Sequence, residues 1–175
     1  MDSPVTPVVN TPTLNIREFQ PSDWSWVWSI LESVFRAGDT YCYATHISEA
    51  EAYQAWIEIP LDTFVAEHKT GEIVGSYFIK ANHPGQGSHV CNCGYVVRPS
   101  SRGMGIGYLM GIHSQEKARN MGFRAMQFNM VVSTNEAAVV LWKKLGFHIV
   151  GILPGAFHHP ILGEVDSYVM FKTLR

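Results

Sequence analysis

The segment RGMGIG, residues 102–107, is the part of the sequence best suited to binding chemistry. It follows the apolar stretch 90–97 and a Pro-Ser-Ser turn, and it precedes a helical pattern. Glycines at 103, 105 and 107 leave backbone N–H groups unobstructed, and a helix N-terminus carries partial positive charge. With the cation of Arg102, these features predict a cradle for a pyrophosphate. The structural alternative is an ordinary flexible turn between a strand and a helix.

The elements around this segment are read from periodicity, capping residues and turn residues. The predicted strands are 14–19, 62–68, 73–81, 90–97, 125–132, 147–153 and 165–171. The predicted helices are one from Ser22 or Asp23 to 36, then 48–59, 104–121 and 134–145. Ser48 and Glu51 have the spacing of a capping box. The order of strands and helices indicates an α/β (α+β) domain rather than a regular βαβ repeat.

Common nucleotide-binding patterns do not fit the glycine segment. No GxxxxGK[ST] string occurs, and GxGxxG fails because Met110 occupies the third glycine position. The pattern that fits is R-x-x-G-x-G, and NEAAVVLWKKLGF at 135–147 follows after one helix and one strand. These two segments, in this order, resemble the two signatures of the GCN5-related N-acetyltransferase (GNAT) superfamily. The resemblance covers residues 13–175 and is most specific over 88–147.

The resemblance implies a GNAT fold and an acetyl-CoA site. The expected fold is a central mixed, mostly antiparallel sheet of about seven strands, flanked by about four helices, with the cofactor in a V-shaped gap. The strand before the glycine loop is expected to splay from its neighbour and to pair with the pantetheine arm. The residues matched to cofactor binding are Tyr95, Val96, Val97, Arg102, Gly103, Met104, Gly105, Ile106, Gly107, Asn135 and Trp142.

Trp142 is a departure from the family pattern. The family usually has a tyrosine there, whose hydroxyl protonates the departing CoA thiolate. An indole N–H can donate a hydrogen bond but cannot act as an acid at neutral pH. The acid role is therefore not transferred to Trp142, and hydrogen bonds alone are expected to stabilise the thiolate.

Three asparagines are the candidate catalytic residues: Asn92, Asn129 and Asn135. Asparagine is depleted in strands, so Asn92 and Asn129 are unusual there, although ordinary hydrogen-bonded polar groups would also explain them. The segments SHVCNCGYVV and FNMVVSTN resemble the fungal acetyltransferases of proline analogues and related bacterial enzymes. The resemblance implies direct attack of the amine on the thioester in a ternary complex. The residues expected to contact substrate are Tyr41, His89, Asn92 and Asn129.

Composition and charge argue against nucleic-acid-binding and membrane-spanning proteins. Of 175 residues, 46% are hydrophobic and 16% charged, with a net charge of -2, which argues against a broad nucleic-acid surface. No apolar run is long enough to span a membrane. Residues 1–12 are predicted to be a flexible leader and 13–175 a single domain. Three cysteines are too few for a disulfide framework and favour a cytoplasmic location.

Metal binding is not expected. The eight histidines are scattered without an HExxH string, and Cys91-x-Cys93 lacks the spacing of a zinc knuckle. His158 and His159 are predicted to lie in a loop between the last two strands.

The leading hypothesis is acetyl transfer from acetyl-CoA to a small-molecule amine, an amino acid or an analogue. The alternatives are acetylation of a protein or peptide, and a non-catalytic CoA-binding sensor. A homodimer is possible.

Overall fold

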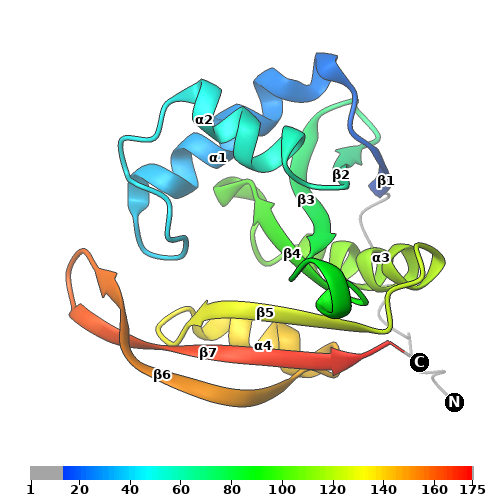
Figure 1. Cartoon of the computed structure of the whole chain (residues 1–175). Helices are drawn as coiled ribbons and strands as arrows, with labels where there is room; N and C mark the ends of the chain where they lie inside the picture. The colour runs from blue at the N-terminus through cyan, green and yellow to red at the C-terminus, as the bar shows by residue number, and fades with distance from the viewer. Residues whose placement is uncertain (1–13, 175) are drawn as a thin grey trace, which may run out of the picture.

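A seven-stranded sheet, in the order β1-β2-β3-β4-β5-β7-β6, organises residues 14–174, which the computed structural model describes (Figure 1). The strands are β1 (Leu14–Glu18), β2 (Asp62–His68), β3 (Ile73–Ala81), β4 (Val90–Val97), β5 (Ala125–Val132), β6 (His148–His159) and β7 (Gly163–Thr173). Neighbouring strands are antiparallel except β4 and β5, which are parallel. The predicted mixed, mostly antiparallel sheet is confirmed. The predicted leader lies outside the described residues.

Within residues 14–174, four α-helices cover the two faces of the sheet. They are α1 (Trp24–Ala37), α2 (Glu49–Tyr53), α3 (Ile106–Asn120) and α4 (Glu136–Lys144). One hydrophobic cluster joins α1 and α2 to one face of β2, β3 and β4, and the other joins α3 and α4 to the opposite face. Figure 1 shows α1 and α2 together at the top of the molecule, and β5, β6 and β7 at the bottom. Within residues 14–174, no helix has both the length and the apolar character required to cross a membrane.

The capping signals place the first two helices correctly. Ser48 and Glu51 form the predicted capping box, with the Glu51 N–H donating to Ser48 Oγ at 3.3 Å. The helix predicted over 48–59 is divided, because α2 continues as a π-helical turn over Gln54–Glu58. Trp56 in that turn is fully buried and donates from Nε1 to Ser76 Oγ on β3 at 3.0 Å.

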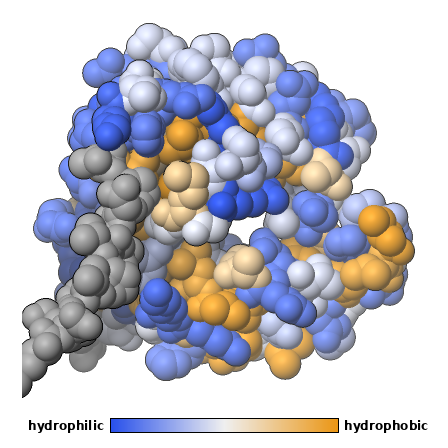
Figure 2. Space-filling view, turned by 180° about the vertical axis from the view of Figure 1, so that it is seen from behind, coloured by the Kyte–Doolittle hydropathy of each residue, from blue (hydrophilic) through white to orange (hydrophobic). Residues whose placement is uncertain are grey.

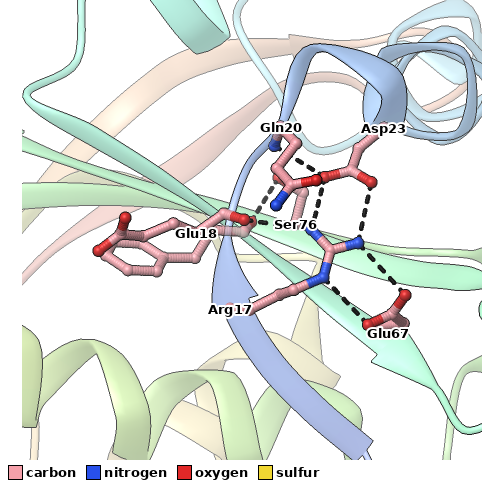
Figure 3. Close-up of polar contacts among 7 residues, drawn as sticks. Arg17, Glu18, Gln20, Asp23, Glu67 and Ser76 are labelled. Atoms are coloured by element: carbon pink, nitrogen blue, oxygen red, sulfur yellow. Dashed lines mark hydrogen bonds and ion pairs between the residues drawn. The ribbon is translucent and has the colours of Figure 1, made fainter.

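An ion-pair cluster fastens the start of α1 to the first two strands (Figure 3). The Arg17 guanidinium on β1 lies between the carboxylates of Asp23 and Glu67, at 2.7 Å and 3.0 Å. Burial opposes ionisation of Asp23, but hydrogen bonds from Arg17 and from the Gln20 N–H outweigh it and lower the pKa of Asp23. Asp23 holds the N-cap position of α1, as one of two predicted candidates, but its carboxylate binds Arg17 and Gln20 instead of capping α1.

The last two strands are longer than the sequence predicts. The β6–β7 ladder continues to His158↔Glu164 and His159↔Gly163, so the two histidines belong to β6. The prediction that they lie in a loop is wrong. An irregularity in the pairing between Leu153 and Phe157 accommodates Pro154 and Gly155, and pairing resumes after it.

Candidate active site

Strands β4 and β5 separate soon after they meet. Their ladder contains only two pairs, Val90↔Ala125 and Cys91↔Met126, whereas β3 accompanies β4 as far as Val97. The backbone N–H and C=O groups of the even-numbered residues on β4 face β3. For example, the Asn82 N–H donates to the Val90 C=O. The peptide groups of residues 93, 95 and 97 therefore face the widening gap. This splayed geometry is the one that the family resemblance implied.

The gap is a cleft of about 760 Å³. It is lined by residues 40–43, 92–97 and 128–132, together with the glycine loop and the first turns of α4. Figure 2 shows an opening that passes between the upper and lower parts of the molecule. One continuous cleft therefore connects the glycine loop to the predicted asparagines.

The glycine loop is open toward the cleft. Gly103 and Gly105 have φ of +78° and +79°, and a Cβ on either residue would meet no atom within 4 Å. Gly105 is the N-cap of α3, so its neighbouring N–H groups point out of the helix end. Gly107 differs, because a Cβ there would lie 3.1 Å from Leu141 Cδ2, so this glycine serves the packing of α3 against α4. The open loop and the nearby Arg102 fit the pyrophosphate of acetyl-CoA.

Tyr41 reaches the splayed strand from the loop between α1 and α2. Its hydroxyl donates to the Tyr95 C=O at 2.8 Å and accepts from the Tyr95 N–H at 2.7 Å. Burial raises the pKa of Tyr41, so the hydroxyl stays protonated at neutral pH. The hydroxyl therefore makes the two hydrogen bonds to Tyr95 that the backbone of a neighbouring strand would make. Sequence reasoning placed Tyr41 in the acceptor wall but did not predict this contact.

A row of amides crosses the gap where the ladder ends. Asn92 Nδ2 on β4 donates to the Gln127 C=O on β5 at 2.9 Å. On β5, Asn129 Oδ1 accepts from Gln127 Nε2 at 2.9 Å, and its Nδ2 donates to Asn82 Oδ1 at 2.8 Å. Asn92 lines the cleft, and its Oδ1 accepts no hydrogen bond within residues 14–174, so it remains available as an acceptor.

Asn135 and Trp142 lie on the α4 side of the cleft. Asn135 is the N-cap of α4, and its Oδ1 accepts from the Ala138 N–H at 3.3 Å. Its Nδ2 remains available as a donor. Trp142 is 7% exposed and packs against Tyr95 and Phe128, with ring centroids 4.7 Å and 4.6 Å away. Trp142 is therefore chiefly a packing residue under the splayed strand.

Most of the predicted site residues line this one cleft. They are Tyr41, Asn92, Tyr95, Val96, Val97, Arg102, Gly103, Gly105, Ile106, Gly107, Asn129, Asn135 and Trp142. Met104 and His89 are not in the lining. Met104 is 49% exposed on the loop. His89 precedes Val90, where β4 is still paired with β5, and its Nδ1 lies 3.1 Å from the Gln86 C=O.

The charges of the cleft all have the same sign. Its lining contains two cations, Lys80 and Arg102, and no aspartate, glutamate or histidine. Burial raises the pKa of the lining thiols Cys42 and Cys93. No described side chain of the lining is therefore suited to accept a proton at neutral pH. The sequence analysis missed Lys80, whose only signal is that it interrupts the apolar run of β3.

A resident metal has no evident ligand set in the described part of the chain. No group of three or more histidine, cysteine, aspartate or glutamate side chains within residues 14–174 is arranged to hold an ion.

Curated proteins that are similar in sequence to this chain are named acetyltransferases. The chain is 38% identical over 100 residues to N-acetyltransferase aca1 of Schizosaccharomyces pombe, covering 55% of this chain and 47% of that protein. It is 33% identical over 102 residues to mycothiol acetyltransferase of Paenarthrobacter aurescens, covering 57% and 31%. The chain thus spans less than half the length of these curated relatives.

Solved structures match nearly the whole chain. A GCN5-related N-acetyltransferase from Kribbella flavida superposes with a TM-score of 0.87 at 36% identity, covering 91% of this chain and 97% of that one. A phosphinothricin acetyltransferase from Sinorhizobium meliloti, in complex with AcCoA, has a TM-score of 0.82 at 19% identity, covering 92% and 88%. The second likeness concerns the fold alone. The sequence profile described as Acetyltransferase (GNAT) family matches residues 24–147. By this match and this fold, the chain belongs to the Acetyltransferase (GNAT) family.

Proposed function

We propose that this chain transfers the acetyl group of acetyl-CoA to the amine of a small molecule, an amino acid or an analogue of one. The observation that supports the proposal is the continuous cleft, which begins at the glycine loop and ends among Asn92, Asn129 and Tyr41. The family membership and the names of the relatives agree with acetyl transfer. The cytoplasmic location and the homodimer stay predictions.

The cofactor end would hold acetyl-CoA by backbone groups. The gap-facing peptide groups of Tyr95 and Val97 would pair with the pantetheine amides, and the glycine loop with Arg102 would hold the pyrophosphate. When bound, acetyl-CoA supplies the thioester carbonyl as acyl donor and leaves as the CoA thiol.

The asparagines position the acceptor. Asn92 Oδ1 accepts a hydrogen bond from the amine N–H, and Asn129 orients the acceptor from the β5 side. Asn135 Nδ2 donates to the departing sulfur. Holding both reactants in one cleft supplies most of the acceleration, because a bimolecular step becomes effectively unimolecular.

The amine must enter as the neutral base. The lining offers no side chain to remove its proton, and its two cations and apolar walls lower the pKa of a bound ammonium. The proton is therefore lost to solvent before attack. This predicts that kcat/KM rises with pH until the free amine is deprotonated.

The test is CoA release from acetyl-CoA with a panel of acceptors: cyclic and primary amino acids, methionine derivatives, polyamines and peptides. Turnover with small amino acids is expected. Turnover with peptides alone would replace the proposal by protein acetylation. Tight acetyl-CoA binding without turnover on any acceptor would replace it by a CoA-binding sensor.

A further inference from the structure

We infer that the acceptor carries a carboxylate and that Lys80 on β3 binds it, an inference that rests on the proposed function and names its substrate class. The inference starts from the charge of the cleft. Lys80 is the cation of the lining that lies outside the glycine loop, and the lining holds no acidic side chain to neutralise it.

Lys80 is placed at the acceptor end by the register of the sheet. It lies directly opposite Asn92 in the β3–β4 ladder, on the face that also carries Phe78. The Lys80 ammonium is 5.5 Å from the centroid of the Phe78 ring. That ring packs over Gly94, where a Cβ would lie 2.5 Å from Phe78 Cε1. The ammonium is therefore held next to the gap-facing part of β4.

The ammonium has no ionic partner within residues 14–174. The arginines Arg17 and Arg98 are paired with carboxylates. The half-buried Lys172 has no acidic partner within residues 14–174, but its ammonium donates to Gln115 Oε1 and to the Leu145 C=O, whereas Lys80 has only the Phe78 ring beside it. A cation in a partly dehydrated cleft is stabilised by an anion, and it disfavours a second cation. A carboxylate on the acceptor supplies that anion.

The spacing suits a single small molecule. Side chains directly opposite each other on neighbouring strands have Cβ atoms about 5 Å apart. Lys80 and Asn92 can therefore contact the carboxylate and the amine of one amino acid at the same time. The same cation disfavours polyamines and lysine side chains, whose remaining charges would lie beside it.

The experiment compares acceptors with and without the carboxylate, and kcat/KM is expressed per concentration of free amine because a carboxamide lowers the pKa of the neighbouring amine. The probes are azetidine-2-carboxylic acid and methionine, each against its carboxamide. The variants are Lys80→Met, which keeps an apolar stem, and Lys80→Arg, which keeps the charge. Lys117→Met is the matched control, because Lys117 Nζ lies 5.4 Å from the Phe64 ring but is not in the cleft lining.

We expect the wild type to prefer the acids. Lys80→Met should lower kcat/KM for the acids at least about tenfold, mainly through KM, and leave the amides nearly unchanged, because a charge-assisted hydrogen bond is lost. Lys80→Arg should restore most of the loss, and Lys117→Met should have no effect. Equal losses for acid and amide, or a wild type that uses both equally, would overturn the inference.

Calorimetry separates this inference from the proposed function. The acids are titrated into wild type and Lys80→Met, each saturated with CoA. If no acceptor is turned over, the proposed transfer is refuted, and this titration still tests whether Lys80 binds the carboxylate. Binding to wild type that Lys80→Met loses would support the carboxylate site. Absence of binding, or equal binding to both, would overturn it.

Discussion

The two ends of the cleft are built in different ways. Most of the cofactor end comes from one continuous stretch, the end of β4 and the glycine loop, which presents backbone groups, and α4 adds Asn135 and Trp142. The acceptor end comes from the loop after α1, from β3, from β4 and from β5, and it presents side chains. The first depends on local backbone conformation, whereas the second depends on sheet register and long-range contacts.

The two ends also differ in their internal bonding. A Cβ on Gly103 or Gly105 would meet nothing within 4 Å. At the acceptor end, Tyr41 bonds to Tyr95 and Asn92 bonds to the Gln127 C=O. A substitution in the glycine loop should therefore act on the ligand directly, whereas one at the acceptor end also alters the bonds that hold the gap.

The largest effect is expected at the cofactor end, from Gly105→Asp. The carboxylate would enter the space assigned to the pyrophosphate and repel it, so acetyl-CoA binding should be abolished in calorimetry. The left-handed φ of +79° adds a strain of about 1–2 kcal/mol. Gly71→Asp is the matched control, since its φ is +84°, its surroundings are open and it lies in the β2–β3 turn. Unchanged affinity in Gly105→Asp would refute the cradle.

Asn92→Ala should have the next largest effect. It removes the proposed acceptor of the amine N–H and the bond to the Gln127 C=O, and we expect kcat to fall about 100-fold. Acetyl-CoA affinity should change little, because the residue lies at the other end of the cleft. Asn15→Ala, an exposed strand asparagine on β1, is the control. Near-normal kcat in Asn92→Ala would remove this residue from the mechanism.

The contrast between the ends explains what the sequence could predict. The glycine loop is contiguous, so residue types and spacing were sufficient to predict it, whereas the splay of the strand before it was implied by the family resemblance. The bounds of β4 and β5 were predicted to the residue, because alternating burial and flanking turns are local signals.

The acceptor end could not be predicted in the same way. Lys80 acquires its place because β3 pairs with β4 in a register that sets it opposite Asn92. A lysine near a strand end has no local signal of such a role. The Tyr41 hydroxyl bonds to a residue 54 positions away, across a loop without periodicity. Predicting either contact requires the tertiary structure.

Tyr41→Phe tests whether a residue of the acceptor end affects the binding of acetyl-CoA, and the expected effect is smaller than that of Asn92→Ala. A ligand that pairs with β4 competes with the Tyr41 hydroxyl for the Tyr95 N–H and C=O. Removing the hydroxyl should cost the free protein about 1–2 kcal/mol in its free energy of unfolding. Acetyl-CoA should then bind about 5- to 30-fold more tightly, because no protein bond is displaced. Tyr43→Phe is the control for the loop, and weaker acetyl-CoA binding in Tyr41→Phe would contradict the competition.

The smallest effect on turnover is expected from Trp142→Phe, at the boundary between the two ends. The indole N–H donates no hydrogen bond within residues 14–174, and the ring packs against Tyr95 and Phe128. Phenylalanine keeps most of this packing, so kcat should stay within about twofold, while the smaller ring costs about 1–2 kcal/mol of stability. Denaturant unfolding and steady-state kinetics measure the two quantities separately. A tenfold fall in kcat with unchanged stability would instead mean that the indole acts on the departing thiolate, and the leaving-group role would then pass from Asn135 to Trp142.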